Sequence, residues 1–124
     1  MNQLILKNLR KNYIKKLNKL KLAYITGASK GIGRSTAIAF ANAGWDLILL
    51  SRDLEMMERL RDELSDTQSK INLVKCDLSN VDEIDKSVKE SIKIYGCPSV
   101  LVNNAGCAFN GNLVGMTLKK WQEI

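Results

Sequence analysis

Four short apolar runs recur along the chain after residue 21. They read LAYIT (22–26), DLILLS (46–51), INLVKC (71–76) and SVLVN (99–103). None alternates strictly between apolar and polar residues, which is typical of strands that are covered on both faces of a parallel sheet. We therefore expect four buried parallel strands.

Segments with helical periodicity separate these runs. The first helix is predicted over Ile32–Ala43, and the second begins after Asp53, a favourable N-cap residue. Ser79 and Asp82 form a capping-box pattern at the start of the third helix, which Gly96 ends. The expected apolar faces are Thr36, Ala37, Phe40 and Ala41, then Leu54, Met57, Leu60 and Leu64, then Val81, Ile84, Val88 and Tyr95.

The alternation of strand and helix predicts an α/β fold, a Rossmann-type doubly wound parallel sheet with right-handed crossovers. Residues 22–124 hold about four strands of such a sheet, and Thr117 can cap a fourth helix near the end. The fourth strand would then be an apolar edge, which invites pairing or aggregation. We expect one incomplete domain that is marginally stable on its own.

The formal charge of +6 belongs to residues 1–21. They hold seven Lys or Arg and no acid, which leaves twelve basic and thirteen acidic residues in the rest of the chain. As a helix, this basic extension would be amphipathic, because apolar residues recur in it every three or four positions: Leu6, Leu9, Tyr13, Leu17 and Leu20. It either packs beside the first strand with its lysines in water or lies on an anionic membrane. No apolar run is long enough for a secretory signal or a membrane span.

The chain contains no His, which excludes imidazole bases, imidazole metal ligands and Ser-His-Asp triads. Cys76, Cys97 and Cys107 are widely separated and odd in number, which fits neither a disulfide framework nor a C-x-x-C motif. Reduced thiols in a cytoplasmic protein are the simpler interpretation.

The sequence TGASKGIG (26–33) lies between the first strand and the first helix, where a phosphate-binding loop belongs. Gly27 can adopt a positive φ, Gly31 allows close approach of a ligand, and Gly33 allows the helix to approach the sheet. The N–H groups of the first helical turn would then bind a pyrophosphate. The candidate binding residues in this loop are Gly27, Ser29, Lys30, Gly31, Ile32 and Gly33.

A second motif, VNNAG (102–106), follows the fourth strand. With both motifs in this order, the chain resembles the short-chain dehydrogenase/reductase family, of the kind that includes 3-oxoacyl-carrier-protein reductases, from about Leu22 to the last residue. The resemblance implies hydride transfer between a nicotinamide cofactor and a small carbonyl or alcohol substrate. It also implies a homo-oligomer when the domain is complete.

Ser51 and Arg52 follow the second strand, where an NAD-binding domain would show an acid. An arginine there would pair with a 2′-phosphate, and charge-assisted hydrogen bonds would favour NADP(H) over NAD by roughly ten- to hundredfold. Lys30 is placed to add a second positive charge. The alternative is that Arg52 only faces water near Asp53.

The ends of the third and fourth strands carry the remaining candidates. By resemblance, Asp77 accepts from the adenine amino group with the Leu78 backbone beside it. An Asx turn is another role for this residue, and different atoms of Asp77 can meet both. Asn103 resembles the family's asparagine that ties neighbouring strands together. The cofactor cleft would be lined by the backbone of Asn104, Ala105 and Gly106, although the same residues also suit an ordinary turn.

The family's catalytic pair, Tyr-x-x-x-Lys, is missing from the sequence. The residues four positions after Tyr13, Tyr24 and Tyr95 are Leu17, Ala28 and Ser99. The resemblance places the catalytic Ser, Tyr and Lys beyond residue 124, so we expect no catalysis by these residues alone. Two interpretations follow: the NADP(H)-binding portion of an oxidoreductase, or a non-catalytic nucleotide-binding or interaction module that uses its basic tail.

Overall fold

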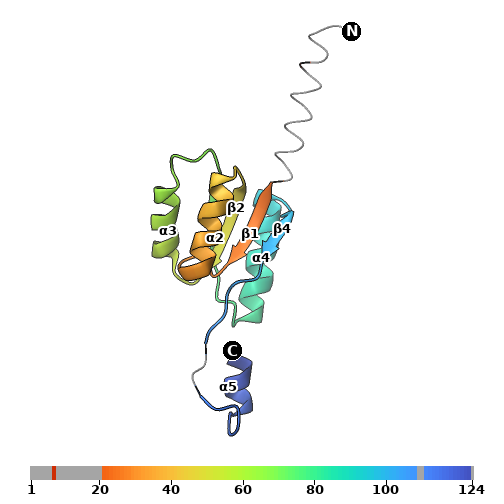
Figure 1. Ribbon diagram of the computed structural model, residues 1–124. Coiled ribbons are helices and arrows are strands. Elements are labelled where there is room, and N and C mark those ends of the chain that lie inside the picture. The colour runs from red at the N-terminus through yellow and green to blue at the C-terminus, as the bar shows by residue number, and fades with distance from the viewer. Residues whose placement is uncertain (1–6, 8–20, 109–110, 124) are drawn as a thin grey trace.

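The computed structural model describes residues 7, 21–108 and 111–123. Strands and helices alternate as the sequence predicts (Figure 1). In chain order they are β1 (Leu22–Thr26), α2 (Gly31–Asn42), β2 (Asp46–Ser51), α3 (Leu54–Glu63), β3 (Ile71–Lys75), α4 (Val81–Tyr95), β4 (Val100–Val102) and α5 (Leu118–Glu123). The amphipathic extension predicted for residues 1–21 lies outside the described residues, apart from Lys7 and Lys21. None of the described helices is long and apolar enough to cross a membrane.

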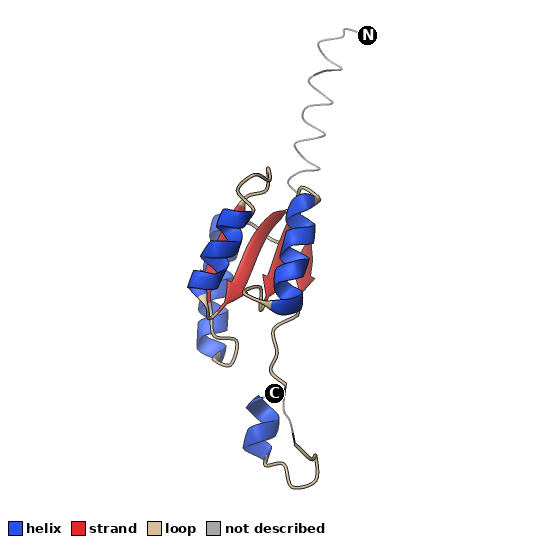
Figure 2. Ribbon diagram, turned by 60° about the vertical axis from the view of Figure 1, so that its left-hand side comes forward, coloured by secondary structure: helices blue, strands red, loops and turns tan. Residues whose placement is uncertain are grey.

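All four strands form one parallel sheet in the order β3-β2-β1-β4. The chain steps from β1 to β2 to β3 in one direction and then returns across the sheet to β4. Because crossovers between parallel strands are right-handed, this reversal places α2 and α3 on one face and α4 on the other (Figure 2). The predicted Rossmann-type architecture is confirmed.

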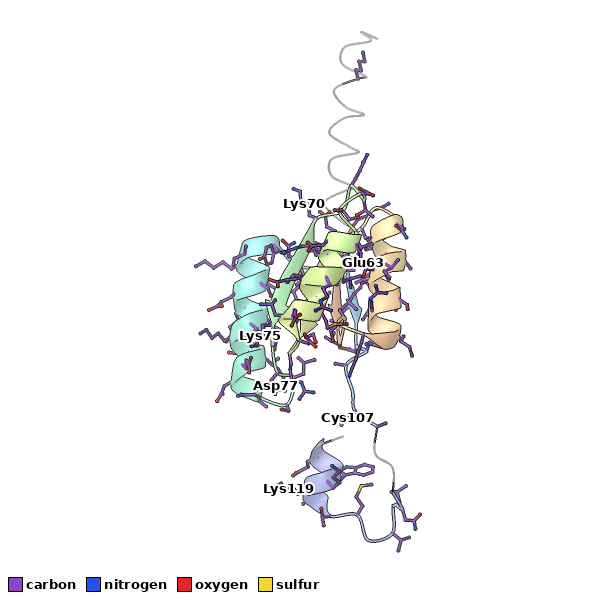
Figure 3. All side chains as sticks on the ribbon, turned by 90° about the vertical axis from the view of Figure 1, so that its left-hand side faces the viewer. Glu63, Lys70, Lys75, Asp77, Cys107 and Lys119 are labelled. Atoms are coloured by element: carbon purple, nitrogen blue, oxygen red, sulfur yellow. The ribbon has the colours of Figure 1, made fainter. Side chains whose placement is uncertain are left out.

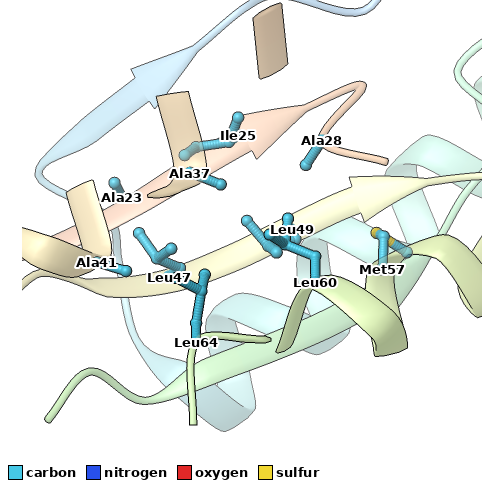
Figure 4. Close-up of a cluster of buried hydrophobic side chains, with 10 residues drawn as sticks. All are labelled: Ala23, Ile25, Ala28, Ala37, Ala41, Leu47, Leu49, Met57, Leu60 and Leu64. Atoms are coloured by element: carbon cyan, nitrogen blue, oxygen red, sulfur yellow. The ribbon is translucent and has the colours of Figure 1, made fainter. Parts of the chain in front are cut away.

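Each face of the sheet has its own core, because successive side chains of a strand point to opposite faces. One cluster joins the sheet to α2 and α3 (Figure 4) and contains Ala23, Ile25, Ala28, Ala37, Ala41, Leu47, Leu49, Met57, Leu60 and Leu64. The other lies toward α4 and contains Leu22, Tyr24, Ile48, Leu50 and Cys76. All five residues of β1 are buried, which fixes the strand that leads into the glycine-rich loop.

A buried polar contact fastens α4 to the central strand. The Tyr24 hydroxyl donates to Ser91 Oγ, and Ser91 Oγ donates to the Val88 carbonyl at 3.0 Å. Burial raises the pKa of Tyr24, although the hydrogen bond to Ser91 opposes this. Neither side chain stands out in the sequence as more than part of a strand or helix.

The outer strands are less buried than the sequence pattern predicts. β3 and β4 are largely half-buried, and Leu101 is 58% exposed. Among the described residues β4 pairs only with β1, so the expected apolar sheet edge is confirmed.

The start of α4 differs from the predicted capping box. Asn80 is the N-cap residue, and its Oδ1 accepts from the N–H groups of Asp82 (3.1 Å) and Glu83 (3.2 Å). Ser79 instead donates its N–H and its hydroxyl to Asp77, and the Asp82 N–H that a capping box would bring to Ser79 goes to Asn80, so the helix begins one residue later than expected. Val81 is 76% exposed and Tyr95 is 37% exposed, so the expected apolar face of this helix is wrong at both of its ends.

Candidate functional site

The predicted binding residues lie at the carboxyl ends of the strands. In Figure 3 this is the lower end of the sheet, where Asp77 is labelled, while Lys70 just before β3 marks the opposite end. The connection after β1 leads toward β2, whereas the neighbouring β4 lies on the other side of β1. Such a reversal of strand order opens the crevice in which α/β sheets bind ligands.

The glycine-rich loop turns sharply at two points. Gly27 has φ of 64° and Gly31 has φ of 57°, a left-handed conformation that side chains disfavour. The Gly27 N–H donates to the Leu50 carbonyl at 2.8 Å, which holds the loop against the end of β2. A Cβ on Gly27 would lie 2.9 Å from Ala105 Cα, so the loop also touches the segment after β4.

Gly33 is packed tightly against the same junction. A Cβ there would lie 2.3 Å from the Gly27 carbonyl oxygen and 2.4 Å from Asn104 Nδ2, distances that real Cβ atoms do not show. The missing side chain therefore lets the first turn of α2 rest on the loops that follow β1 and β4. The sequence predicted that Gly33 would let the helix approach the sheet. In the structure, the helix approaches atoms of these two loops.

The amino end of α2 keeps an electropositive character. Its N-cap residue Lys30 makes no side-chain capping bond, and no acid lies in the first turn. The first N–H groups of a helix have no partner within it, and they carry the positive end of the helix dipole. Lys30, Gly31 and Ile32 are exposed here, with Ile32 at 79%. Backbone donors and one ammonium group are thus available to an anion.

Two serines join the glycine-rich loop to the end of β2. Ser51 Oγ donates to Ser29 Oγ at 2.9 Å and accepts from the Asp53 N–H at 3.3 Å. Ser29 is buried. These hydroxyls therefore position the loop, and their direct contact with a ligand stays a prediction.

Arg52 and Asp77 face each other across the ends of β2 and β3. Arg52 Nη1 lies 3.9 Å from Asp77 Oδ2, with side chains 76% and 37% exposed. Asp77 Oδ1 accepts from the Ser79 N–H (2.9 Å) and hydroxyl (2.8 Å), which confirms the Asx-type turn. These two hydrogen bonds lower the pKa of Asp77, and the charge of Arg52 adds a smaller effect.

The neighbours of this pair have structural roles. Asp53 caps α3 by accepting from the Met56 N–H at 3.1 Å, so its carboxylate is already engaged. The Leu78 side chain packs against the cluster under α4, which leaves only its backbone for a ligand.

Thr26 and Asn104 tie the ends of β1 and β4 together. Thr26 Oγ1 accepts from the N–H groups of Asn104 and Ala105, both at 3.0 Å, and donates to the Val102 carbonyl at 3.2 Å. Asn104 Nδ2 donates to the carbonyls of Thr26 (3.0 Å) and Gly27 (3.3 Å). All the hydrogen-bonding capacity of the Thr26 hydroxyl is thereby used.

The strand-tying asparagine is Asn104 and not Asn103, which corrects the expectation from the sequence. Val102 packs toward the α2 face, and side chains two residues apart point the same way, so Asn104 reaches β1 and Gly33. Asn103 is exposed, as are Ala105 and Gly106 at the rim of the site. The signal that sequence reasoning missed is Thr26, a hydroxyl at the end of an otherwise buried strand.

These groups suit an anionic ligand that carries hydrogen-bonding groups. The edge offers backbone donors at α2, the cations Lys30 and Arg52, and the acceptor Asp77. No cluster of side chains able to hold a metal ion occurs within residues 7, 21–108 and 111–123.

Comparison with known proteins agrees with this arrangement. The family model for short chain dehydrogenases matches residues 21–124. The chain is 38% identical to farnesol dehydrogenase from Aedes aegypti, covering 77% of this chain and 39% of that protein. It is 30% identical to a 3-oxoacyl-[acyl-carrier-protein] reductase from Synechocystis, covering 84% and 42%. The chain thus spans about two fifths of the length of these relatives.

A solved structure superposes well on the same region. The alcohol dehydrogenase from the archaeon Thermococcus sibiricus, complexed with 5-hydroxy-NADP, matches with a TM-score of 0.77 and 30% identity. The match covers 83% of this chain and 44% of that one.

Proposed function

The chain belongs to the short-chain dehydrogenase family, and from this premise we propose that residues 22–124 are the NADP(H)-binding portion of an oxidoreductase. The reaction would transfer a hydride between the nicotinamide and a carbonyl or alcohol substrate. The observation that carries the proposal is the close packing of Gly33 against Gly27 and Asn104. This packing places the amino end of α2, which has no side-chain cap, beside the crevice where the strand order reverses.

The residues at this edge fit a dinucleotide phosphate. Gly31 has open space where a Cβ would point, so a ligand can approach the backbone there. We assign the pyrophosphate to the loop of Gly27, Ser29, Lys30, Gly31, Ile32 and Gly33, where the first N–H groups of α2 and the helix dipole favour negative charge. When bound, the cofactor supplies the hydride chemistry.

The other strand ends would hold the adenosine half and the neighbouring ribose. Arg52 would pair with the 2′-phosphate, with Lys30 as a second cation and Ser51 beside them. Asp77 and the Leu78 backbone would bind the adenine. The segment Asn104, Ala105 and Gly106 would line the cleft near the other ribose, and its position is fixed by Thr26.

Proton exchange is not assigned to any of these residues, because no tyrosine in the sequence is followed four residues later by lysine. We propose a small-molecule substrate and a homo-oligomeric assembly for the whole enzyme by analogy with its family. We also propose a cytoplasmic location, which the odd number and wide separation of the three cysteines in the sequence support.

The decisive experiment is a titration of the 124-residue chain with NADPH and NADH, followed by nicotinamide fluorescence. Arg52→Gln should weaken NADPH binding about tenfold and leave NADH binding nearly unchanged, because a charge-assisted contact to the 2′-phosphate is lost. Arg59→Gln is the matched control, since Arg59 is also exposed but pairs with Glu55 on the outside of α3. Equal effects of Arg52→Gln on both cofactors would refute the assignment, as would the absence of NADPH binding at millimolar concentration.

A further inference from the structure

An acid lies beside the arginine that the proposed function assigns to the 2′-phosphate. Asp77 Oδ2 is 3.9 Å from Arg52 Nη1. Any phosphate that reaches the guanidinium therefore comes close to a second negative charge. The ends of β2 and β3 carry this pair side by side because the two strands are hydrogen-bonded neighbours, with Ser51 opposite Lys75.

The position of the acid is fixed, whereas that of the arginine is not. Ser79 donates two hydrogen bonds to Asp77 Oδ1, and the N–H of Asn80 donates to the Asp77 carbonyl at 3.1 Å. This leaves Oδ2 directed toward Arg52. The arginine side chain is 76% exposed, and its contact with Asp77 is longer than a hydrogen bond, so it can leave the carboxylate for a ligand.

We propose that Asp77 is a specificity-determining residue that limits the preference of this site for a 2′-phosphate, so that the site takes both phosphorylated and unphosphorylated adenine dinucleotides. The inference rests on the proposed function. Asp77 repels the phosphate, which carries a charge of about −1.5 to −2 near neutral pH. It also competes with the phosphate for Arg52.

The opposite effect, in which Asp77 helps by orienting Arg52, is weaker. An exposed ion pair without a hydrogen bond contributes little to fixing a long side chain. Repulsion acts on a doubly charged group and does not depend on such orientation. A ligand with a 2′-hydroxyl in place of the phosphate meets no such repulsion, because the hydroxyl is uncharged.

The test compares 2′,5′-ADP with 5′-AMP, two fragments that differ only in the 2′-phosphate. Their dissociation constants for the full 124-residue chain are measured by ligand-observed NMR. Asp77→Asn keeps an oxygen for the Ser79 N–H and should raise the preference for 2′,5′-ADP roughly three- to tenfold. Asp77→Ser, which can form a similar turn, should act in the same direction. The gain should shrink in 1 M salt because the effect is between exposed charges.

Glu90→Gln is the matched control, because it removes the same charge from an exposed position near the far end of α4. It should leave the preference unchanged. If both Asp77 variants lower the preference or change the two affinities equally, the inference is overturned while the proposed function stands. If the wild-type protein does not prefer 2′,5′-ADP, or if Arg52→Gln leaves that preference intact, the NADP(H) assignment fails and the inference fails with it.

Discussion

Replacing Gly33 by Ala tests the junction on which the candidate site depends. A Cβ at this position must move from 2.3 Å to about 3.4 Å from the Gly27 carbonyl oxygen to reach an ordinary contact. The first turn of α2 and the two loops would therefore separate by about 1 Å. This shift would lengthen the bonds from Asn104 Nδ2 to the carbonyls of Thr26 and Gly27.

The expected cost follows from these contacts. Overpacking or the loss of two hydrogen bonds costs about 1–3 kcal/mol, and the better helix propensity of alanine returns at most about 1 kcal/mol. We expect Gly33→Ala to lower the free energy of unfolding by about 1–2 kcal/mol. In urea denaturation followed by far-UV circular dichroism, the midpoint should fall by about 1 M.

Gly106→Ala is the control, because a Cβ on Gly106 meets nothing within 4 Å and this glycine is not among those with positive φ. Its free energy of unfolding should stay within about 0.5 kcal/mol of wild type. The combination Gly33→Ala with Asn104→Ala should cost less than the sum of the two, since Asn104 is one of the groups displaced. Equal stability of the two glycine variants would refute the packing argument.

Two other predictions follow from the core and the sheet edge. Tyr24→Phe should cost about 0.5–1.5 kcal/mol in urea denaturation, because it removes a buried donor to Ser91. Burial raises the folded-state pKa of Tyr24, so the contribution of this group to stability should be constant below pH 10 and be lost above it. The phenylalanine variant should therefore lose less stability than wild type above pH 10, and parallel profiles in that range would contradict this. The exposed β4 edge should make the chain self-associate, and its dissociation constant for NADPH should be above the micromolar range. Because Leu101 is exposed on this edge, Leu101→Lys should reduce self-association in sedimentation velocity. A monodisperse wild-type monomer with micromolar NADPH affinity would refute the edge argument.

Local patterns were sufficient for the order of elements. The four apolar runs became β1 to β4 with bounds within one residue at each end, and Asp53 and Thr117 cap α3 and α5 as expected. Such signals depend on residues three or four positions apart, so they can be read from one sequence. The capping box at Ser79 failed because Asp77 accepts from the Ser79 N–H and Asn80 accepts from the Asp82 N–H, the two donors that the box would use.

Other features depended on contacts between distant residues. Leu47 and Leu101 belong to similar apolar runs, yet Leu47 is fully buried and Leu101 is 58% exposed. The difference arises because β2 is an inner strand and β4 an edge, and strand order is not encoded in either run. The pairing of Tyr24 with Ser91 is hidden in the same way, since 67 residues separate them.

The sequence by itself determined the chemistry of the site: a glycine-rich loop after the first strand, an arginine after the second, an aspartate after the third and Asn-Asn-Ala-Gly after the fourth. Parallel strands bring their carboxyl ends to one edge, so this convergence follows from the order of elements. Only the tertiary structure decided which amide ties β4 to β1, because Asn104 meets Thr26 across 78 residues. It likewise decided that Asp77 stands against Arg52, since the neighbouring position of β2 and β3 sets that distance.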